Sequence, residues 1–168
     1  DNYGAIYKND QRLGNSVREH QVGDLTGTVA WTDNYGSIYK NDQMLGRSAR
    51  SFQIARLTGD VVWQEQGGAL YKNDQRLGHD AREFAVHPFS GEVIWIDRSG
   101  YLYKGDNRLG GDAQRFEIAR YSGDIAWVDR FGTLYKNDTN VGSNCAEFKI
   151  DEDGRILWKD RWGEHRIS

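Results

Sequence analysis

A glycine, one further residue and an apolar–Tyr–Lys triplet recur along this chain at a fixed spacing of 32 residues. The repeated glycines are Gly4, Gly36, Gly68, Gly100 and Gly132. Five tandem copies of one unit therefore account for nearly all of the 168 residues. A period of about 20–50 residues is typical of propellers, solenoids and other repeat arrays. Such repetition argues against most single-site enzymes, because their catalytic groups differ from one another and converge on one point.

Each unit has the pattern of several short β-strands separated by turns. In the second unit, the segments 36–40, 51–55 and 58–63 are rich in β-branched and aromatic residues, and Gly, Asn and Asp lie between them. A very short further strand is expected around residues 44–45. This strand–turn rhythm predicts an all-β chain. No segment shows a 3.6-residue apolar period of helical length, so we predict no helix.

The strands that end at the repeated tryptophans carry continuous apolar runs, such as Val61-Val62-Trp63. A strand that is covered on both faces has this pattern, and sheets packed face to face around a ring cover it in this way. The predicted fold is therefore all-β: a five-bladed β-propeller of 32-residue repeats that start near residues 4, 36, 68, 100 and 132. It forms a single domain over residues 1–168. A linear β-solenoid is the main alternative, and it would need polar caps at both ends.

The two ends of the sequence hold complementary parts of one unit. The segment Gly4–Lys8 lacks a preceding tryptophan strand, and the Trp158 strand lacks a full following partner. We expect the N- and C-terminal strands to pair in one blade, which closes the ring and removes both exposed edges. Residues 164–168 are then surplus, and we expect them to fray.

The repeated motif resembles that of a known lectin family. Phe-x-Ile-Ala is followed, after a short gap, by Val-x-Trp-x-Asp-x-x-Gly-x-(Ile/Leu)-Tyr-Lys, which resembles the tectonin repeat. The Gly-x-Leu-Tyr and Tyr-Lys pattern is also similar to that of the tachylectin propellers. The resemblance covers all five units and implies a β-propeller with multivalent carbohydrate binding, with each site on or between blades. The units of this chain are shorter, and they lack a proline before the apolar strand.

Charge and composition exclude several classes of partner. The net charge of −3 provides no basic field for nucleic acid. No apolar run approaches the roughly 18 residues that span a membrane, so no membrane insertion is expected. The single cysteine, Cys145, occupies a position held by valine or alanine in the other units, which predicts a small buried thiol. The four histidines lie at non-equivalent positions, which argues against a repeated zinc site.

Polar residues that recur in most units are the candidate ligand-binding positions. Asparagine and aspartate follow the Tyr-Lys pair, and arginine lies two residues further on. Turn formation explains the Asn-Asp pair, but a β-turn does not need the arginine. Together the three side chains could hydrogen-bond sugar hydroxyls from several directions. The candidate residues are Asn9, Asp10, Arg12, Asn41, Asp42, Asn73, Asp74, Arg76, Asp106, Arg108, Asn137 and Asp138.

These residues predict a lectin with up to five equivalent weak sites for glycans. Multivalent binding would raise its avidity by about 10²–10⁴ over that of one site. A secreted or cell-surface-facing location would suit that function.

A second set of acids, two residues after each tryptophan, is interpreted as a turn between strands. Its members are Asp33, Glu65, Asp97, Asp129 and Asp160. One acid per unit does not supply a calcium site, and near-equivalent copies argue against an acid–base pair. We therefore expect no enzyme activity, catalytic residue, metal or cofactor.

The alternative function is a non-catalytic scaffold that presents one propeller face to a protein partner. Such a face would use residues that differ between units, and exposed aromatic and arginine side chains suit interface hot spots. The residues that vary at the turns after the tryptophan strands are Tyr3, Tyr35, Arg98, Arg130, Phe131 and Trp162.

Overall fold

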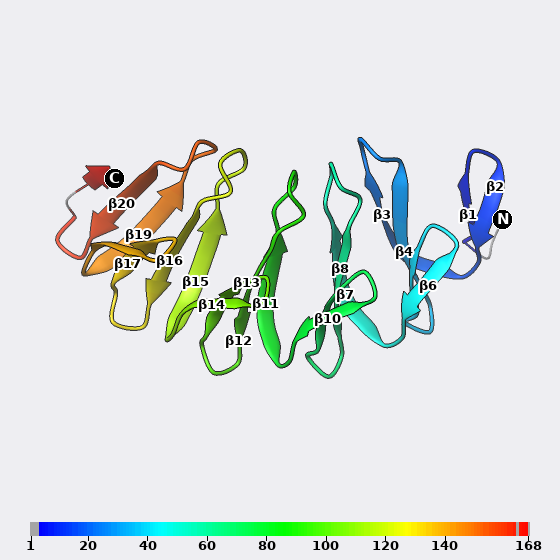
Figure 1. Cartoon of the computed structure of the whole chain (residues 1–168), viewed down its shortest axis with the longest axis horizontal. Coiled ribbons are helices and arrows are strands. Elements are labelled where there is room, and N and C mark those ends of the chain that lie inside the picture. Colours follow the sequence, from blue (N-terminus) through cyan, green and yellow to red (C-terminus); the bar gives the residue numbers. More distant parts are fainter. Residues whose placement is uncertain (1–3, 164, 168) are drawn as a thin grey trace. The chain divides into compact units, whose positions relative to one another are not determined.

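The structure, a computed structural model, describes residues 4–163 and the backbone of residues 165–167 (Figure 1). Every helix or strand assigned in this part of the chain is a β-strand, which confirms the all-β prediction. Across these residues no helix is long and apolar enough to cross a membrane. The described chain divides into two compact units. One comprises the residues up to Ala81 together with Pro88–Gly91, and the other comprises Arg82–His87 and the residues from Glu92 onward.

The first compact unit contains a two-stranded sheet and two four-stranded sheets, all antiparallel. The two-stranded sheet consists of β1 (Ile6–Lys8) and β2 (Gln11–Gly14). The next sheet consists of β3 (Val17–Gly23), β4 (Thr28–Asp33), β5 (Ile38–Lys40) and β6 (Gln43–Gly46). The third consists of β7 (Ala49–Ile54), β8 (Val61–Glu65), β9 (Leu70–Lys72) and β10 (Gln75–Gly78).

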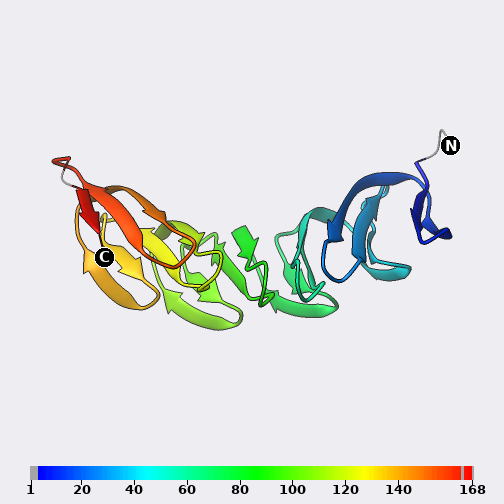
Figure 2. The same cartoon turned by 90° about the horizontal axis from the view of Figure 1, so that it is seen from above.

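The second compact unit contains two four-stranded sheets and a three-stranded sheet (Figure 2). The first consists of β11 (Ala81–Val86), β12 (Val93–Asp97), β13 (Leu102–Lys104) and β14 (Asn107–Gly110). The second consists of β15 (Ala113–Ile118), β16 (Ile125–Asp129), β17 (Leu134–Lys136) and β18 (Thr139–Gly142). The third consists of β19 (Cys145–Ile150), β20 (Ile156–Asp160) and β21 (His165–Ile167).

Within each four-stranded sheet, every strand pairs with its neighbour in sequence, which is the strand order of a propeller blade. The second strand lies inside the sheet and its residues are buried on both faces, as the apolar runs predicted. Its tryptophan lies opposite the tyrosine of the third strand, and the two rings stack. The ring centroids are 4.0 Å apart in Trp31–Tyr39, 4.3 Å in Trp63–Tyr71, 4.2 Å in Trp95–Tyr103 and 4.2 Å in Trp127–Tyr135.

Consecutive sheets of one compact unit share a core. Ala30 and Ile38 of the β3–β6 sheet form one buried cluster with Phe52, Val61 and Trp63 of the β7–β10 sheet. Equivalent clusters join the β11–β14 sheet to the β15–β18 sheet, and the latter to the β19–β21 sheet. The β15–β18 sheet therefore buries one face against the sheet before it and the other against the sheet after it, and the buried clusters lie at the junctions between sheets.

Within each compact unit, a glycine at the end of a sheet's last strand provides the space for the tryptophan of the following sheet. A Cβ atom built on Gly46 would lie 2.6 Å from Cζ2 of Trp63, and one built on Gly110 would lie 2.6 Å from Cζ2 of Trp127. No L residue with a side chain fits there without displacing the indole. The repeated Leu-Gly or Val-Gly that ends these strands is thus a packing requirement.

The pairing at the C-terminal end differs from the prediction. We expected the strand at Ile6–Lys8 to pair with the Trp158 strand and residues 164–168 to fray. In the described residues β20 pairs instead with β21, and β1 pairs with β2. The physical reason is that Gly163 begins another copy of the strand pattern, so β21 has the register that β17 has in the preceding sheet. Residues 164 and 168 lie outside the described residues.

Candidate functional site

The recurring Asn-Asp pairs lie in the two-residue loops between the third and fourth strands of the sheets. In the β9–β10 loop, Asn73 has a left-handed backbone conformation with φ of 53°. Asparagine tolerates this conformation better than most residues, and Asn9, Asn41 and Asn137 share it. In the fourth unit Gly105 replaces the asparagine and has φ of 61°. The position therefore selects for residues that accept a positive φ.

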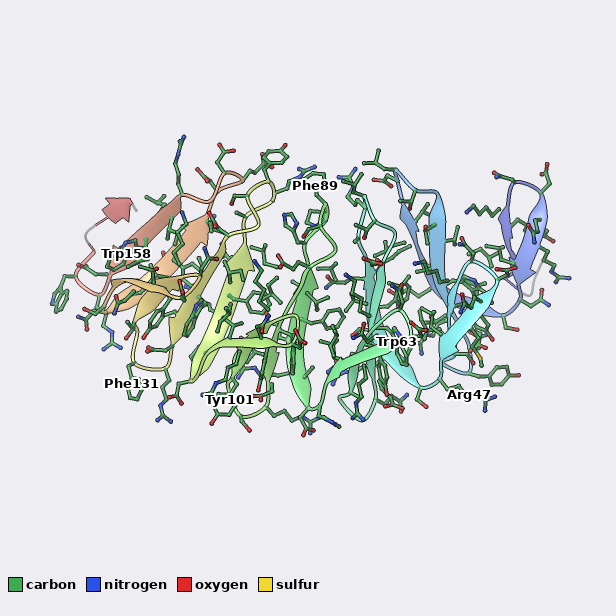
Figure 3. The ribbon with its side chains drawn as sticks, in the orientation of Figure 1. Arg47, Trp63, Phe89, Tyr101, Phe131 and Trp158 are labelled. Carbon is green, nitrogen blue, oxygen red and sulfur yellow. The ribbon has the colours of Figure 1, made fainter. Side chains whose placement is uncertain are left out.

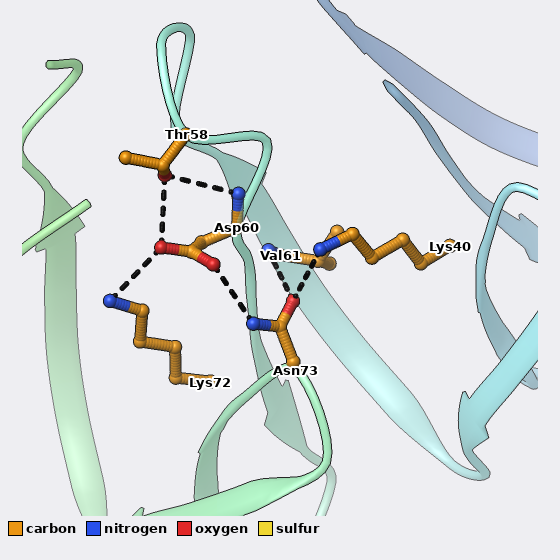
Figure 4. A network of polar contacts seen from close by, with 6 residues as sticks. All are labelled: Lys40, Thr58, Asp60, Val61, Lys72 and Asn73. Atoms are coloured by element: carbon orange, nitrogen blue, oxygen red, sulfur yellow. Dashed lines mark hydrogen bonds and ion pairs between the residues drawn. The ribbon is translucent and has the colours of Figure 1, made fainter. Parts of the chain in front are cut away.

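The asparagine side chain also joins strands that are far apart in sequence (Figure 4). Asn73 Oδ1 accepts hydrogen bonds from the Val61 N–H at 3.1 Å and from Lys40 Nζ at 3.1 Å. Its Nδ2 donates to Asp60 at 2.9 Å. Its backbone carbonyl accepts the indole N–H of Trp63 at 2.9 Å. Asn73 is thus bonded on every side within the protein.

The same arrangement recurs in the neighbouring copies. Asn41 accepts from the Val29 N–H, and its carbonyl accepts from the indole of Trp31. Asn137 accepts from the Ile125 N–H and donates to Asp124. Three of the four asparagines in the candidate set therefore have hydrogen-bonding groups engaged in holding their own sheet together.

The lysine before each asparagine completes this polar network. Lys72 pairs with Asp60 at 3.0 Å, and Lys136 pairs with Asp124 at 3.4 Å. Burial works to raise the pKa of Asp60, but hydrogen bonds from Asn73, Lys72 and Thr58 hold it below the ordinary aspartate value of 3.8. Burial also works against the Asp124 carboxylate, and bonds from Asn137 and the charge of Lys136 hold its pKa below the same value.

These lowered pKa values predict an acid-sensitive fold. A carboxyl with a lower pKa in the folded state adds stability above the unfolded pKa, and this stability is lost as the pH falls through the folded value. We expect the free energy of unfolding, from urea titrations, to decrease from about pH 5 toward pH 2. Asp60→Asn will be less stable than the parent at neutral pH and will lose less on acidification. The matched control is Asp74→Asn in the adjacent exposed loop, and parallel curves for the Asp60 variant and the parent would contradict the prediction.

The aspartates and arginines of the candidate set are exposed on the same loops and strands, but they do not pair with one another. Asp10, Asp42, Asp74, Asp106 and Asp138 are exposed. Arg12 donates to Asn15, Arg76 contacts His79, and the guanidinium of Arg108 lies 3.6 Å from the centre of the Tyr101 ring. Among the described residues, no hydrogen bond or ion pair joins an aspartate of the set to one of its arginines. The set therefore forms separate exposed loops, one per copy.

The second set of acids holds the hairpin tips between the second and third strands, which confirms their interpretation as turn residues. Asp33 is buried, and its Oδ1 accepts the N–H groups of Tyr35 at 2.9 Å and Ser37 at 2.8 Å. Burial opposes ionisation, but these bonds keep the pKa of Asp33 below the usual aspartate value. Asp129 accepts from Phe131 and Thr133 in the same way. These tips have a fixed backbone.

The side chain of the residue at the centre of each tip takes no part in these hydrogen bonds. Tyr35, Phe131 and Trp162 occupy it in three copies and are 88%, 64% and 77% exposed. Gly67 and Ser99 occupy it in two others. Figure 3 shows Phe131 at the tip of the β16–β17 hairpin, where the Arg130 guanidinium lies 4.8 Å from its ring centre. The fold therefore does not require an aromatic residue here. Tyr3, the fourth aromatic residue that the sequence suggested, lies outside the described residues.

Sequence reasoning missed a second group of exposed apolar residues, at the hairpins between the first and second strands. Leu25 and Leu57 in the first compact unit and Tyr121 in the second are exposed. The sequence feature that could have identified them is an apolar residue two positions before the turn glycine, as in Leu25-Thr26-Gly27. Neighbouring hairpins of this kind are joined by ion pairs, Arg56–Asp24 at 2.7 Å and Arg120–Glu152 at 3.3 Å.

Cys145 and His87 have structural roles. Cys145 is buried, as predicted, and burial raises the pKa of its thiol although Arg115 opposes the shift. His87 is buried, and its Nε2 donates to the Arg120 carbonyl at 2.9 Å. Within the described residues, no three His, Cys, Asp or Glu side chains gather where they could hold a metal ion.

No protein-family model matches the chain, and no curated protein sequence matches it. Among solved structures, the chain is similar to the WD40 β-propeller domain of Doa1, with 15% sequence identity and a TM-score of 0.39. The match covers 93% of this chain and 64% of that one. The assignment of blade-like sheets rests on the strand pairing and not on this similarity.

Proposed function

We propose that this protein is a non-catalytic interaction module that binds a protein partner through the hairpin tips between its second and third strands. The observation that supports it is the exposure of Tyr35, Phe131 and Trp162 on tips whose backbone is fixed by other residues. Water-exposed aromatic side chains do not stabilise a fold, and Gly67 and Ser99 show that the turn forms without them. A backbone that is already fixed loses little entropy on binding, so aromatic side chains on these tips suit hot spots.

The arginines beside the aromatic residues narrow the kind of partner. Two tips of the second compact unit read Asp129-Arg130-Phe131-Gly132 and Asp160-Arg161-Trp162-Gly163. In the first, the Arg130 guanidinium lies 4.8 Å from the centre of the Phe131 ring, and in the second Arg161 directly precedes Trp162. A segment with acidic and apolar side chains fits such pairs, because arginine binds carboxylates bidentately while the ring fills an apolar pocket.

The expected result is a loss of binding without a loss of stability. Peptides selected from a displayed library against the parent protein will bind Phe131→Ser/Trp162→Ser at least about 30-fold more weakly. Serine is the residue already present at Ser99, so the melting temperature should not change. Leu25→Ser/Leu57→Ser, at the other row of hairpins, is the control and should retain binding. Selected peptides that bind all three proteins equally would contradict the proposal.

Carbohydrate binding by the repeated Asp and Arg side chains is the second candidate. The observation that favours it is that these side chains are exposed at the same place in successive copies, including Asp10 with Arg12 and Asp74 with Arg76. Up to five equivalent weak glycan sites would follow. A glycan array tests this directly: signal that Asp74→Ala/Arg76→Ala reduces by a fraction would support a multivalent lectin, and a blank array would exclude it.

For the architecture we propose a five-bladed ring in which β1 and β2 complete the sheet of β19 and β20. Sequence equivalence supports this, because β1–β2 corresponds to β5–β6 and β19–β20 corresponds to β3–β4. Leu157 of β20 is 49% exposed, whereas Ala126 at the equivalent place is fully buried against the next sheet. Closure would cover this face.

A further inference from the structure

The place beside β20 is occupied by β21, which follows the backbone register of the repeat but differs from it in sequence. Leu157, Trp158 and Lys159 are paired with Ile167, Arg166 and His165. In the preceding sheet, Ala126, Trp127 and Val128 are paired with Lys136, Tyr135 and Leu134. The register is identical, but β21 places an arginine where every other copy has the tyrosine that stacks on the tryptophan.

The strand β1 has the sequence that β21 lacks. Ile6-Tyr7-Lys8 repeats Ile38-Tyr39-Lys40 of β5, and it pairs with β2 in the register in which β5 pairs with β6. In the described residues β1 has a partner on one side only, whereas β5, β9, β13 and β17 each lie between two strands. Placed beside β20 in the common register, β1 would bring Tyr7 opposite Trp158.

We propose that β1 and β21 compete for the same edge of β20, so that the last sheet is a two-state element. This inference rests on the ring closure proposed above. In one state β21 pairs with the edge of β20, as in the present register. In the other, β1 displaces β21, and the ring is closed. The strand β21 has the advantage of proximity, since only four residues separate it from β20, and β1 has the advantage of the matching side chains and of β2 behind it.

One charge in the sheet opposes β1. In three copies, the lysine of the third strand pairs with an acid twelve residues earlier: Lys72 with Asp60, Lys104 with Glu92 and Lys136 with Asp124. The position equivalent to those acids in the last sheet is Arg155. Lys8 would therefore meet a like charge beside β20, whereas the β21 residue in that register position is the uncharged Ile167. Arg155 thus biases the competition toward β21.

A trap with three cysteines measures this competition within one molecule. In a Cys145→Ala background, which matches Ala49, Ala81 and Ala113, Lys159→Cys is combined with Ile6→Cys and His165→Cys. Position 159 lies opposite position 165 in the present register, and it would lie opposite position 6 in the closed one. Oxidation in a glutathione buffer, followed by peptide mass spectrometry, gives the ratio of the 6–159 to the 165–159 disulfide.

We expect both disulfides to form within the monomer. Arg155→Asp should raise the ratio of the 6–159 to the 165–159 disulfide by about three- to tenfold, because it replaces the repulsion between Arg155 and Lys8 with an ion pair. Arg155→Ser should give an intermediate ratio. If the ratio is the same with Arg, Ser and Asp at position 155, the proposed competition between β1 and β21 is wrong, whereas the proposed ring closure is not contradicted. If the 6–159 disulfide is absent even after residues 164–168 are deleted, closure itself fails. A 6–159 disulfide found only in dimers would overturn the proposal in favour of strand exchange between copies.

Discussion

Replacing Gly46 with alanine will lower the free energy of unfolding by about 2–3 kcal/mol, because the added methyl group occupies space that the Trp63 ring fills. The backbone conformation of Gly46 is not left-handed, so the effect is steric and not conformational. Urea denaturation followed by tryptophan fluorescence measures it.

Two further variants separate this mechanism from a general intolerance of alanine. Gly67 has nothing within 4 Å of its missing Cβ, so Gly67→Ala should cost no stability. Trp63→Leu will itself be destabilising by about 3 kcal/mol, because it removes a buried ring. On that background, however, Gly46→Ala should cost little. Additive costs in the double variant would show that the indole does not limit the space at position 46.

Asn73→Ala is the second variant with a large expected effect, about 3 kcal/mol of destabilisation. It leaves the Val61 N–H without its acceptor and removes from Asp60 one of its three side-chain donors, the others being Lys72 and Thr58. It also places a Cβ-bearing residue without polar compensation at φ of 53°. The measurement is again the urea-unfolding free energy.

The chain offers its own control for the backbone part of this loss. Gly105 occupies the equivalent position in the fourth unit and still accepts the indole N–H of Trp95 at 2.7 Å. Asn73→Gly should therefore retain the turn while losing the side-chain bonds, and should be about 1 kcal/mol more stable than Asn73→Ala. Equal losses for the two variants would mean that the conformation of the loop contributes nothing.

Much of the local structure could be predicted from the sequence, because a period of 32 residues shows the same strand and turn signals five times. The strand around Val61–Trp63 and the short strand around Met44–Leu45 are both present. The burial of Cys145 was predicted from the small residues at equivalent positions. In each case the signal lies within a few residues of the feature.

Long-range relations could not be predicted in the same way. The role of Asn73 depends on Val61 and Asp60, which lie twelve and thirteen residues earlier, and on Lys40 in the preceding sheet. Turn propensity explains the presence of asparagine without revealing these bonds. The partner of β20 was predicted wrongly for the described chain, because residues 165–167 lack the Tyr-Lys signal although their backbone follows the repeat.

Within each compact unit, the glycine that ends one sheet receives the tryptophan ring of the next sheet, and every repeat carries both the glycine and the tryptophan. A repeat of this kind is complementary to a copy of itself. Duplicating 32 codons in tandem would create the protruding ring and the recess that receives it in a single genetic step, with no further substitution. The number of sheets in such a chain can therefore change in whole units while the chemistry of every junction stays the same.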